Sequence, residues 1–217
     1  MNTEFDNKLS QIKALTWLPF IGLNYFSNDV KTIIVGESHY YKPVDEKSYE
    51  NHLIPWFTRE VVEEMCFNRE YWNIKLFPNF HRAMMGNDTF DSTKFWNDFA
   101  FYNFIQRPMN MDIWERPNYE DFDSGWDTFY KLIPILKPDR VLFLGNSSAD
   151  RFNGSATRNE IKIEYVQWIK KIGSAYAKKA YMYHGDTKIQ LDFIKHPSQY
   201  FSWDKWREYL LEIGLAK

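Results

Sequence analysis

The sequence predicts a single α/β domain of three layers, with a mostly parallel, four-stranded central sheet between two layers of helices. Four short hydrophobic segments bounded by turn residues have the pattern of buried strands. Segments with apolar residues at helical spacing lie between them, an alternation typical of parallel sheets with crossover helices. No Pro/Gly/Ser-rich linker or change in composition divides the chain, so we expect one domain over residues 1–217.

The predicted strands begin near residues 32, 99, 140 and 190. Residues 32–35 and 191–194 are short runs that are mostly apolar or β-branched. Residues 99–104 are hydrophobic except for Asn103, and an Arg-Pro pair ends that segment shortly afterwards. Residues 140–145 form another buried strand, which ends in glycine. All four segments are short enough for strands of a compact sheet.

The segments around these strands predict helices. Thr58 followed by acidic residues has the pattern of an N-cap and first helical turn, and Lys137-Pro138 marks a helix end. The predicted helices cover residues 4–15, 58–74, 120–137 and 202–211, and a further helix is expected to begin near 146–148. Residues 181–184 are predicted to form a hairpin with the last strand around Gly185-Asp186.

The composition narrows the functional classes. The single cysteine, Cys66, excludes an internal disulfide and any metal site built from several thiolates. We therefore expect a reducing compartment and neither a metal nor a cofactor. The N-terminus lacks the pattern of a signal peptide, and no apolar stretch approaches membrane-spanning length. These features predict a cytoplasmic protein without membrane contact, which we expect to be a monomer.

The formal net charge of −2 gives no global attraction for a polyanion. Contacts to phosphates require only a local basic patch, however. Several basic residues lie near predicted strand ends or in the loops between them: Lys42, Arg59, Arg107, Arg116, Lys188 and Lys195.

Polar residues follow the carboxyl end of each predicted strand. They are Gly36 to Tyr41, Asn103, Gly145 to Ser147, and His196 to Ser198. In open parallel α/β sheets, ligands bind just beyond the carboxyl ends of the strands. The sequence therefore predicts a functional site that gathers these four groups at one edge of the sheet.

These motifs resemble those of the uracil-DNA glycosylase superfamily. The first motif of that family, Gly-Gln-Asp-Pro-Tyr-His or Gly-Glu-Ala-Pro-Gly, is similar to Gly36-Glu37-Ser38-His39-Tyr40-Tyr41. The second, His-Pro-Ser, occurs as His196-Pro197-Ser198. Between them the family places an Asn at the end of its second strand, which Asn103 matches, and a hydrophobic strand ending in Gly, which residues 141–145 match. The resemblance spans residues 30–206.

The resemblance implies a glycosylase that hydrolyses the N-glycosidic bond of a flipped uracil or modified pyrimidine. Its catalytic residues would be His196, Glu37 and Ser38. Bond cleavage leaves negative charge on the departing base, and His196 can donate a hydrogen bond to a base carbonyl. Glu37 can orient water or stabilise a cationic sugar. Ser38 stands where the best-known branch has a water-positioning Asp, so slow turnover, a different base or loss of catalysis are the alternatives.

The resemblance also implies which residues would bind the base. Asn103 presents a donor and an acceptor that match a pyrimidine edge. Phe57 follows the first motif by the interval at which the family keeps a stacking ring, and Tyr40 aligns with the tyrosine beside position 5 of the base. Gly36 opens the motif. Ser198, Gln199 and Tyr200 would contact the nucleic-acid backbone or act as a wedge. The implied partner is DNA, either single-stranded or damaged or modified duplex, or a nucleotide.

Two other functions fit parts of the same sequence. Ser38 in Gly36-Glu37-Ser38-His39-Tyr40, together with Asp150 and His196, occurs in the chain order of α/β serine hydrolases. The fifth position of that motif is normally glycine, and Tyr40 fits it poorly. The other alternative is a catalytically weak binder of nucleic acid or nucleotides with the same fold. Ser38 and the near-neutral charge favour this alternative.

Overall fold

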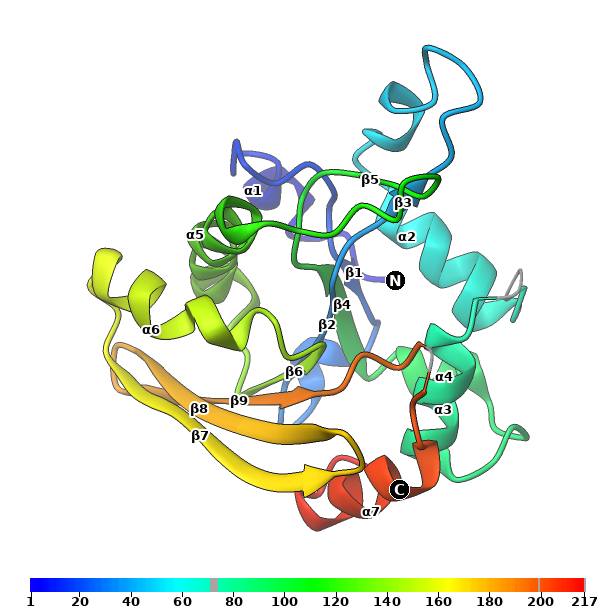
Figure 1. Ribbon diagram of the computed structural model, residues 1–217. Coiled ribbons are helices and arrows are strands. Elements are labelled where there is room, and N and C mark those ends of the chain that lie inside the picture. The colour runs from blue at the N-terminus through cyan, green and yellow to red at the C-terminus, as the bar shows by residue number, and fades with distance from the viewer. Residues whose placement is uncertain (71–73, 199, 217) are drawn as a thin grey trace.

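The computed structural model describes residues 1–70, 74–198 and 200–216. In this part of the chain, seven strands form one mixed sheet in the order β1-β4-β2-β6-β9-β8-β7 (Figure 1). The strands are β1 (Phe20–Ile21), β2 (Thr32–Gly36), β4 (Phe99–Asn103), β6 (Arg140–Leu144), β7 (Ile163–Ile172), β8 (Ala175–His184) and β9 (Thr187–Ile194). A separate pair of short parallel strands comprises β3 (Tyr40–Tyr41) and β5 (Met109–Asn110).

The four predicted strands all lie in this sheet as neighbours. β4, β2, β6 and β9 are mutually parallel, with Gly36 opposite Asn103 and Leu144 opposite Ile194. Successive side chains of these strands enter the cores on opposite faces, as Ile33 and Ile34 do. Burial on both faces explains why these strands appear as continuous hydrophobic runs in the sequence. Their carboxyl ends share one edge of the sheet.

The prediction of a four-stranded, mostly parallel sheet is wrong in strand number and in its mixed character. β1 pairs antiparallel with β4 at one edge, and β8 and β7 extend the other edge antiparallel to β9. The hairpin predicted between residues 181–184 and the last strand is confirmed, but β8 begins earlier, at Ala175. β7 was not predicted because most of its side chains are exposed and no continuous apolar run marks it.

Helices cover both faces of the sheet, an arrangement compatible with three layers (Figure 1). One face packs against α1 (Asp6–Leu9), α5 (Tyr119–Leu136) and α6 (Ala149–Arg158). The other packs against α2 (Phe57–Val62), α3 (Leu76–Met85), α4 (Ser92–Trp96) and α7 (Trp203–Glu212). Single 3₁₀ turns cover Tyr25–Ser27 and Glu50–His52. In the described ranges, no helix is both long and apolar enough to cross a membrane.

Two predicted helices are too long. The helix predicted over 4–15 is confined to α1, and single turns continue the chain from Leu9 to Leu15. Phe5, Ile12 and Leu15 still pack against the core, which accounts for the periodicity. Of the helix predicted over 58–74, residues 71–73 lie outside the described residues, and the described part contains α2 and one π-helical segment, Glu63–Phe67. The positive φ of Arg69, 59°, lies outside any right-handed helix.

The helices predicted over 120–137 and 202–211 agree with α5 and α7 within a residue or two. α5 begins with a capping box, in which the Asn118 side chain accepts from Asp121 N–H and the Asp121 carboxylate accepts from Asn118 N–H. The helix expected near 146–148 is α6, which begins at Ala149. α5 and α6 therefore both begin near the carboxyl ends of the parallel strands.

Candidate functional site

The carboxyl ends of β2 and β4 bring Gly36 and Asn103 into direct contact. A Cβ atom on Gly36 would collide with Oδ1 of Asn103, so only glycine leaves room for the amide. Asn103 is buried, and no hydrogen bond in the described part of the chain involves its carboxamide. Asn103 keeps 5% of its surface exposed, so its carboxamide reaches solvent at the strand ends and is available to a ligand. The two residues therefore form a small polar surface at adjacent strand ends.

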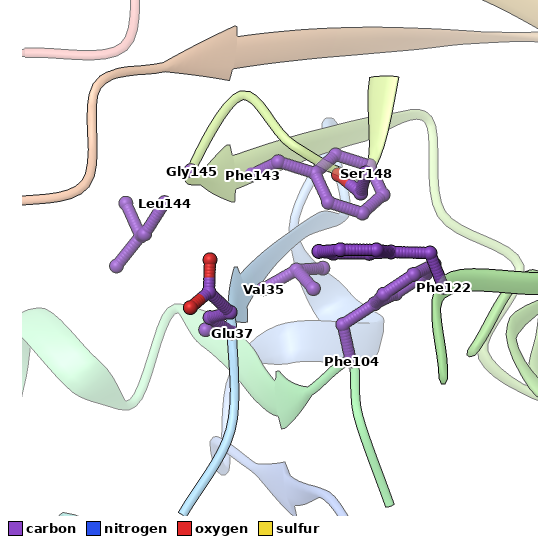
Figure 2. A pocket seen from close by; sticks show the side chains of 9 residues that line it. Val35, Glu37, Phe104, Phe122, Phe143, Leu144, Gly145 and Ser148 are labelled. Atoms are coloured by element: carbon purple, nitrogen blue, oxygen red, sulfur yellow. The ribbon is translucent and has the colours of Figure 1, made fainter. Parts of the chain in front are cut away.

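Glu37 follows Gly36 and lies in a narrow pocket at the end of the sheet. Figure 2 shows its carboxylate directed toward Leu144 and Gly145 at the end of β6, with the rings of Phe104 and Phe122 to one side, past Val35. Oε2 lies 3.6 Å from the position that a Cβ atom of Gly145 would occupy. The free volume of the pocket is 10 Å³, about the space required by one water molecule. Burial raises the pKa of Glu37, and Arg116 opposes this shift.

Arg116 lies across the mouth of this region on the exposed loop that precedes α5. Its Nη1 is 3.7 Å from Glu37 Oε1 and donates to the Tyr40 hydroxyl over 3.4 Å. Burial raises the pKa of Tyr40, an effect that Arg116 opposes. Burial, and secondarily the Arg116 charge, lowers the pKa of His196 to about 4. The same guanidinium thus acts on Glu37, Tyr40 and His196.

His196 extends from the loop after β9, and α3 fixes the backbone that follows it. The Asn79 amide donates to the carbonyls of Pro197 and Ser198, both over 3.0 Å. Ser198 N–H donates to the His196 carbonyl over 2.8 Å. These bonds hold the His-Pro-Ser segment in a tight turn. At its lowered pKa, the half-buried imidazole is neutral at pH 7 and donates through one ring nitrogen.

The Ser38 hydroxyl is buried and has no hydrogen-bond partner among the described residues. Hydrogen bonding from Ser38 is a minor cause that lowers the pKa of Tyr40, so the two hydroxyls lie near each other, although their geometry falls short of a hydrogen bond. Asp150 instead pairs with Lys178 over 2.7 Å. Among the described residues, no hydrogen bond or ion pair links Ser38, Asp150 and His196 into a triad.

Phe57 and His39 lie on the α2 side of the first motif. His39 is buried, its Nε2 bonds to Thr58 Oγ1 over 2.8 Å, and its ring packs edge-on against Trp17 and Phe57. Burial lowers the pKa of His39 to about 3. The half-buried Phe57 ring also meets His52 at a centroid distance of 4.9 Å. In the described part of the chain, the Phe57 ring therefore packs against His39 and His52. It has no described ring contact with His196.

Tyr200 is 89% exposed, and its positive φ of 58° turns the chain outward. Gln199 lies outside the described residues. An open groove of 650 Å³ runs between Ser198, Tyr200 and the start of α3, where Lys75 and Asn79 contribute polar side chains. Through Ser198, this groove adjoins the turn that follows His196.

The structure divides the six basic candidates into two groups. Four have partners: Arg59 with Asp6, Arg107 with Asp121 and Glu115, Lys188 with Glu164, and Lys195 with Ser174 and the Tyr200 carbonyl. Within the described residues, Arg116 has only the two long contacts given above, and Lys42 is exposed without a partner. The sequence placed Arg116 among scattered charges and gave no sign of its position at the site. Its contacts come from residues 76 or more positions earlier in the chain.

The described side chains contain no group of three or more His, Cys, Asp and Glu residues arranged to hold a metal ion. In comparisons with known proteins, no family model matches the chain, and no curated protein matches its sequence significantly.

Proposed function

We propose that the protein hydrolyses the N-glycosidic bond of a pyrimidine-type base in DNA or a nucleotide, as a divergent member of the uracil-DNA glycosylase superfamily. The observation that carries the proposal is the unpaired Asn103 carboxamide, which lies against Gly36 at adjacent strand ends. Its donor and acceptor match the hydrogen-bonding edge of a pyrimidine. A base at this position completes the bonding of a buried amide and is thereby selected.

His196 is proposed as the donor to the departing base. Cleavage places negative charge on a base carbonyl oxygen, and a preorganised hydrogen-bond donor stabilises that charge in the transition state. A neutral imidazole serves this purpose because it keeps one N–H. β2 and β6 separate the strands that carry Asn103 and His196, an interval of roughly 14 Å between strand axes. Two side chains and a base ring can bridge this interval.

Glu37 and Ser38 are proposed to hold the attacking water. The pocket beside Glu37 has the volume of a single water molecule. The raised pKa of Glu37 makes its carboxylate a better proton acceptor than an exposed one. The base itself must lie on the Asn103 side, since the pocket beside Glu37 is too small for it. Tyr40 would border the base, and the exposed part of Phe57 would stack against it.

The DNA strand is proposed to cross the rim toward Ser198 and Tyr200. The groove beside these residues has a volume of 650 Å³ and includes Lys75, whose ammonium group can contact a phosphate. Tyr200 projects into solvent, where a ring can fill the gap left by a flipped base.

The experiment is mass-spectrometric detection of free bases released from a panel of oligonucleotides, each with one modified pyrimidine, in single-stranded and duplex form. We expect at least one base to be released by the wild-type protein. Binding of an oligonucleotide without release of any base would identify the catalytically weak binder instead. Neither binding nor release, with covalent labelling of Ser38 by a fluorophosphonate, would identify a serine hydrolase.

A further inference from the structure

We propose that Arg116 is the phosphate-binding residue of this site and gives it a preference for phosphorylated ligands over nucleosides and free bases. The inference deepens the proposed function and rests on it, because it requires that the site takes a nucleotide unit. It assigns a specificity-determining role to a residue outside the strand-end motifs.

The guanidinium of Arg116 contacts the protein through Nη1, whereas its Nε and Nη2 edge faces solvent. Nη1 faces Tyr40 Oη at 3.4 Å and Glu37 Oε1 at 3.7 Å. Its Nε and Nη2 atoms have no partner among the described residues, and 74% of the side chain is exposed. Adjacent N–H groups on the free edge of a guanidinium match two oxygens of a phosphate. Arg116 therefore has the bonding capacity for one phosphate without losing its contacts to the site.

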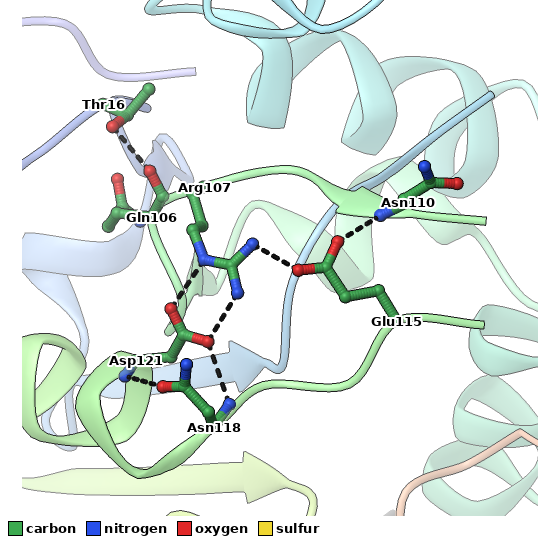
Figure 3. Close-up of polar contacts among 7 residues, drawn as sticks. All are labelled: Thr16, Gln106, Arg107, Asn110, Glu115, Asn118 and Asp121. Carbon is green, nitrogen blue, oxygen red and sulfur yellow. Dashed lines mark hydrogen bonds and ion pairs between the residues drawn. The ribbon is translucent and has the colours of Figure 1, made fainter. Parts of the chain in front are cut away.

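The backbone around Arg116 is fixed although its side chain is exposed. On one side, Glu115 accepts from Arg107 Nη1 over 2.7 Å and from Asn110 N–H over 2.8 Å. On the other, Asn118 caps α5 through Asp121, which itself binds Arg107 through two nitrogens. Figure 3 shows these contacts as one continuous cluster.

These contacts restrict the conformation of the loop that contains Arg116. Pro117 restricts the residue before it to extended conformations, which limits the backbone of Arg116 further. The Arg107 cluster thus anchors both neighbours of a short exposed segment and directs Arg116 toward Tyr40 and Glu37. A preorganised cation loses less conformational entropy on binding than a freely moving one.

The charges around Arg116 are compatible with an anion. Tyr40 and His196 are uncharged at neutral pH, because burial raises the pKa of the first and lowers that of the second. Glu37 is the neighbouring acid, and it lies at the Nη1 edge of the guanidinium, away from the edge that is open to a phosphate. In Arg107, by contrast, Nε, Nη1 and Nη2 all donate to Asp121 or Glu115, so this guanidinium has no comparable free edge.

The test measures binding of three probes, uridine, uridine 5′-monophosphate and a short single-stranded oligonucleotide with one deoxyuridine, over a series of salt concentrations. The variants are Arg116→Ala, Arg116→Lys and, as a control for loss of one exposed charge, Lys131→Ala on the outer surface of α5. We expect Arg116→Ala to weaken oligonucleotide binding about 10-fold or more. The slope of log K against log salt should become shallower by about 0.7.

Arg116→Lys should keep the salt slope but recover only part of the affinity, since it lacks the planar fork. Lys131→Ala should bind as the wild type does. Weakening of both phosphorylated probes would indicate contact with the phosphate of the flipped nucleotide itself, and weakening of the oligonucleotide alone would indicate a neighbouring strand phosphate.

Unchanged binding of the oligonucleotide by Arg116→Ala would overturn the inference, as would equal weakening of uridine or no oligonucleotide binding by the wild type. Base release is measured separately. A wild-type protein that binds through Arg116 but releases no base contradicts the proposed hydrolysis and leaves the phosphate contact standing.

Discussion

The Arg107 cluster consists of Arg107, Glu115, Asn118 and Asp121, and the strand-end site consists of Glu37, Tyr40, Asn103, Arg116 and His196. The two groups of residues lie on neighbouring loops, yet the pKa values of their ionisable side chains are shifted by opposite causes. In the cluster, burial disfavours the charged form of Asp121, but hydrogen bonds from Arg107 and Asn118 outweigh it and lower the pKa of this carboxyl. At the site, burial is the leading cause of every shift, so the pKa of Glu37 is raised and that of His196 lowered. The cluster keeps its groups charged, whereas the site favours their neutral forms.

This difference separates a structural role from a functional one. Every charge in the cluster has a complementary partner, and all three nitrogens of the Arg107 guanidinium donate to a carboxylate. At the site, the buried Ser38 hydroxyl, the solvent-reaching Asn103 amide and one edge of Arg116 have no hydrogen-bond partner in the described part of the chain. Polar groups without a protein partner can bind a ligand at no cost in existing hydrogen bonds, whereas the groups of the cluster would have to give up their partners.

Arg107→Ala should have the largest effect on stability, because it leaves Asp121 and Glu115 without their cation. The side chain is about one-third exposed, and we expect the free energy of unfolding in urea to fall by about 2 kcal/mol. Lys131→Ala, with the same charge change on an exposed helix surface, serves as the control and should change it by less than about 0.5 kcal/mol. Equal stability of the two variants would show that the cluster does not stabilise the loop.

Asp121→Asn should reduce stability by about 1.5 kcal/mol at pH 7. The folded-state pKa of Asp121 is below its unfolded value, so its contribution is present above the unfolded pKa of about 3.9 and is lost as the pH falls through the folded pKa. The difference between variant and wild type should therefore shrink in acid. Urea unfolding over a pH series measures this, and a constant difference would contradict the assignment of a charged, hydrogen-bonded carboxylate.

Glu37→Gln should change the free energy of unfolding in the opposite direction from Asp121→Asn. The folded-state pKa of Glu37 is raised, so its contribution to stability is full below the unfolded pKa of about 4.3 and is lost as the pH rises through the folded pKa. Removing the charge should stabilise the protein by about 0.5 kcal/mol at pH 7 and change nothing near pH 4. Base release should decrease in the same variant. Destabilisation at neutral pH would indicate that Glu37 is structural, as Asp121 is.

Tyr200→Ala should leave stability unchanged within about 0.5 kcal/mol, because this ring is almost fully exposed. Release of a base from duplex DNA should decrease more than release from a single strand, since only the duplex requires a wedge. Rates on the two substrates, compared for variant and wild type, provide the measurement. Equal decreases on both would contradict a wedge role for Tyr200.

The sequence was sufficient to predict the parallel centre of the sheet but not its edges. β2, β4, β6 and β9 are buried on both faces, and continuous apolar segments mark such strands. β7 is an edge strand with bulges near Gln167 and Lys170, and neither strict alternation nor continuous hydrophobicity identifies it. In the first helix, the core-facing residues were predicted, but turns rather than a continuous helix position most of them.

At the site, too, the sequence predicted what the parallel strands position but not what loop packing positions. The strand-end rule predicted that Gly36 and Asn103 would lie at one edge of the sheet, because parallel strands end together. It did not distinguish Arg107 from Arg116, which are nine positions apart and chemically identical. Their difference arises from residues that only the folded loops bring near them. Close contacts between loops depend on tertiary packing, which local sequence patterns do not encode.

The central claim is that His196 stabilises the departing base, and single-turnover base release tests it most directly. The rates to compare are those of wild type, His196→Ala, Ser38→Ala and the control His184→Ala, whose side chain is exposed at the end of β8. We predict a loss of about 100-fold or more for His196→Ala, a much smaller loss for Ser38→Ala and none for His184→Ala. Equal losses for His196→Ala and Ser38→Ala, or no base release by the wild type, would contradict the account.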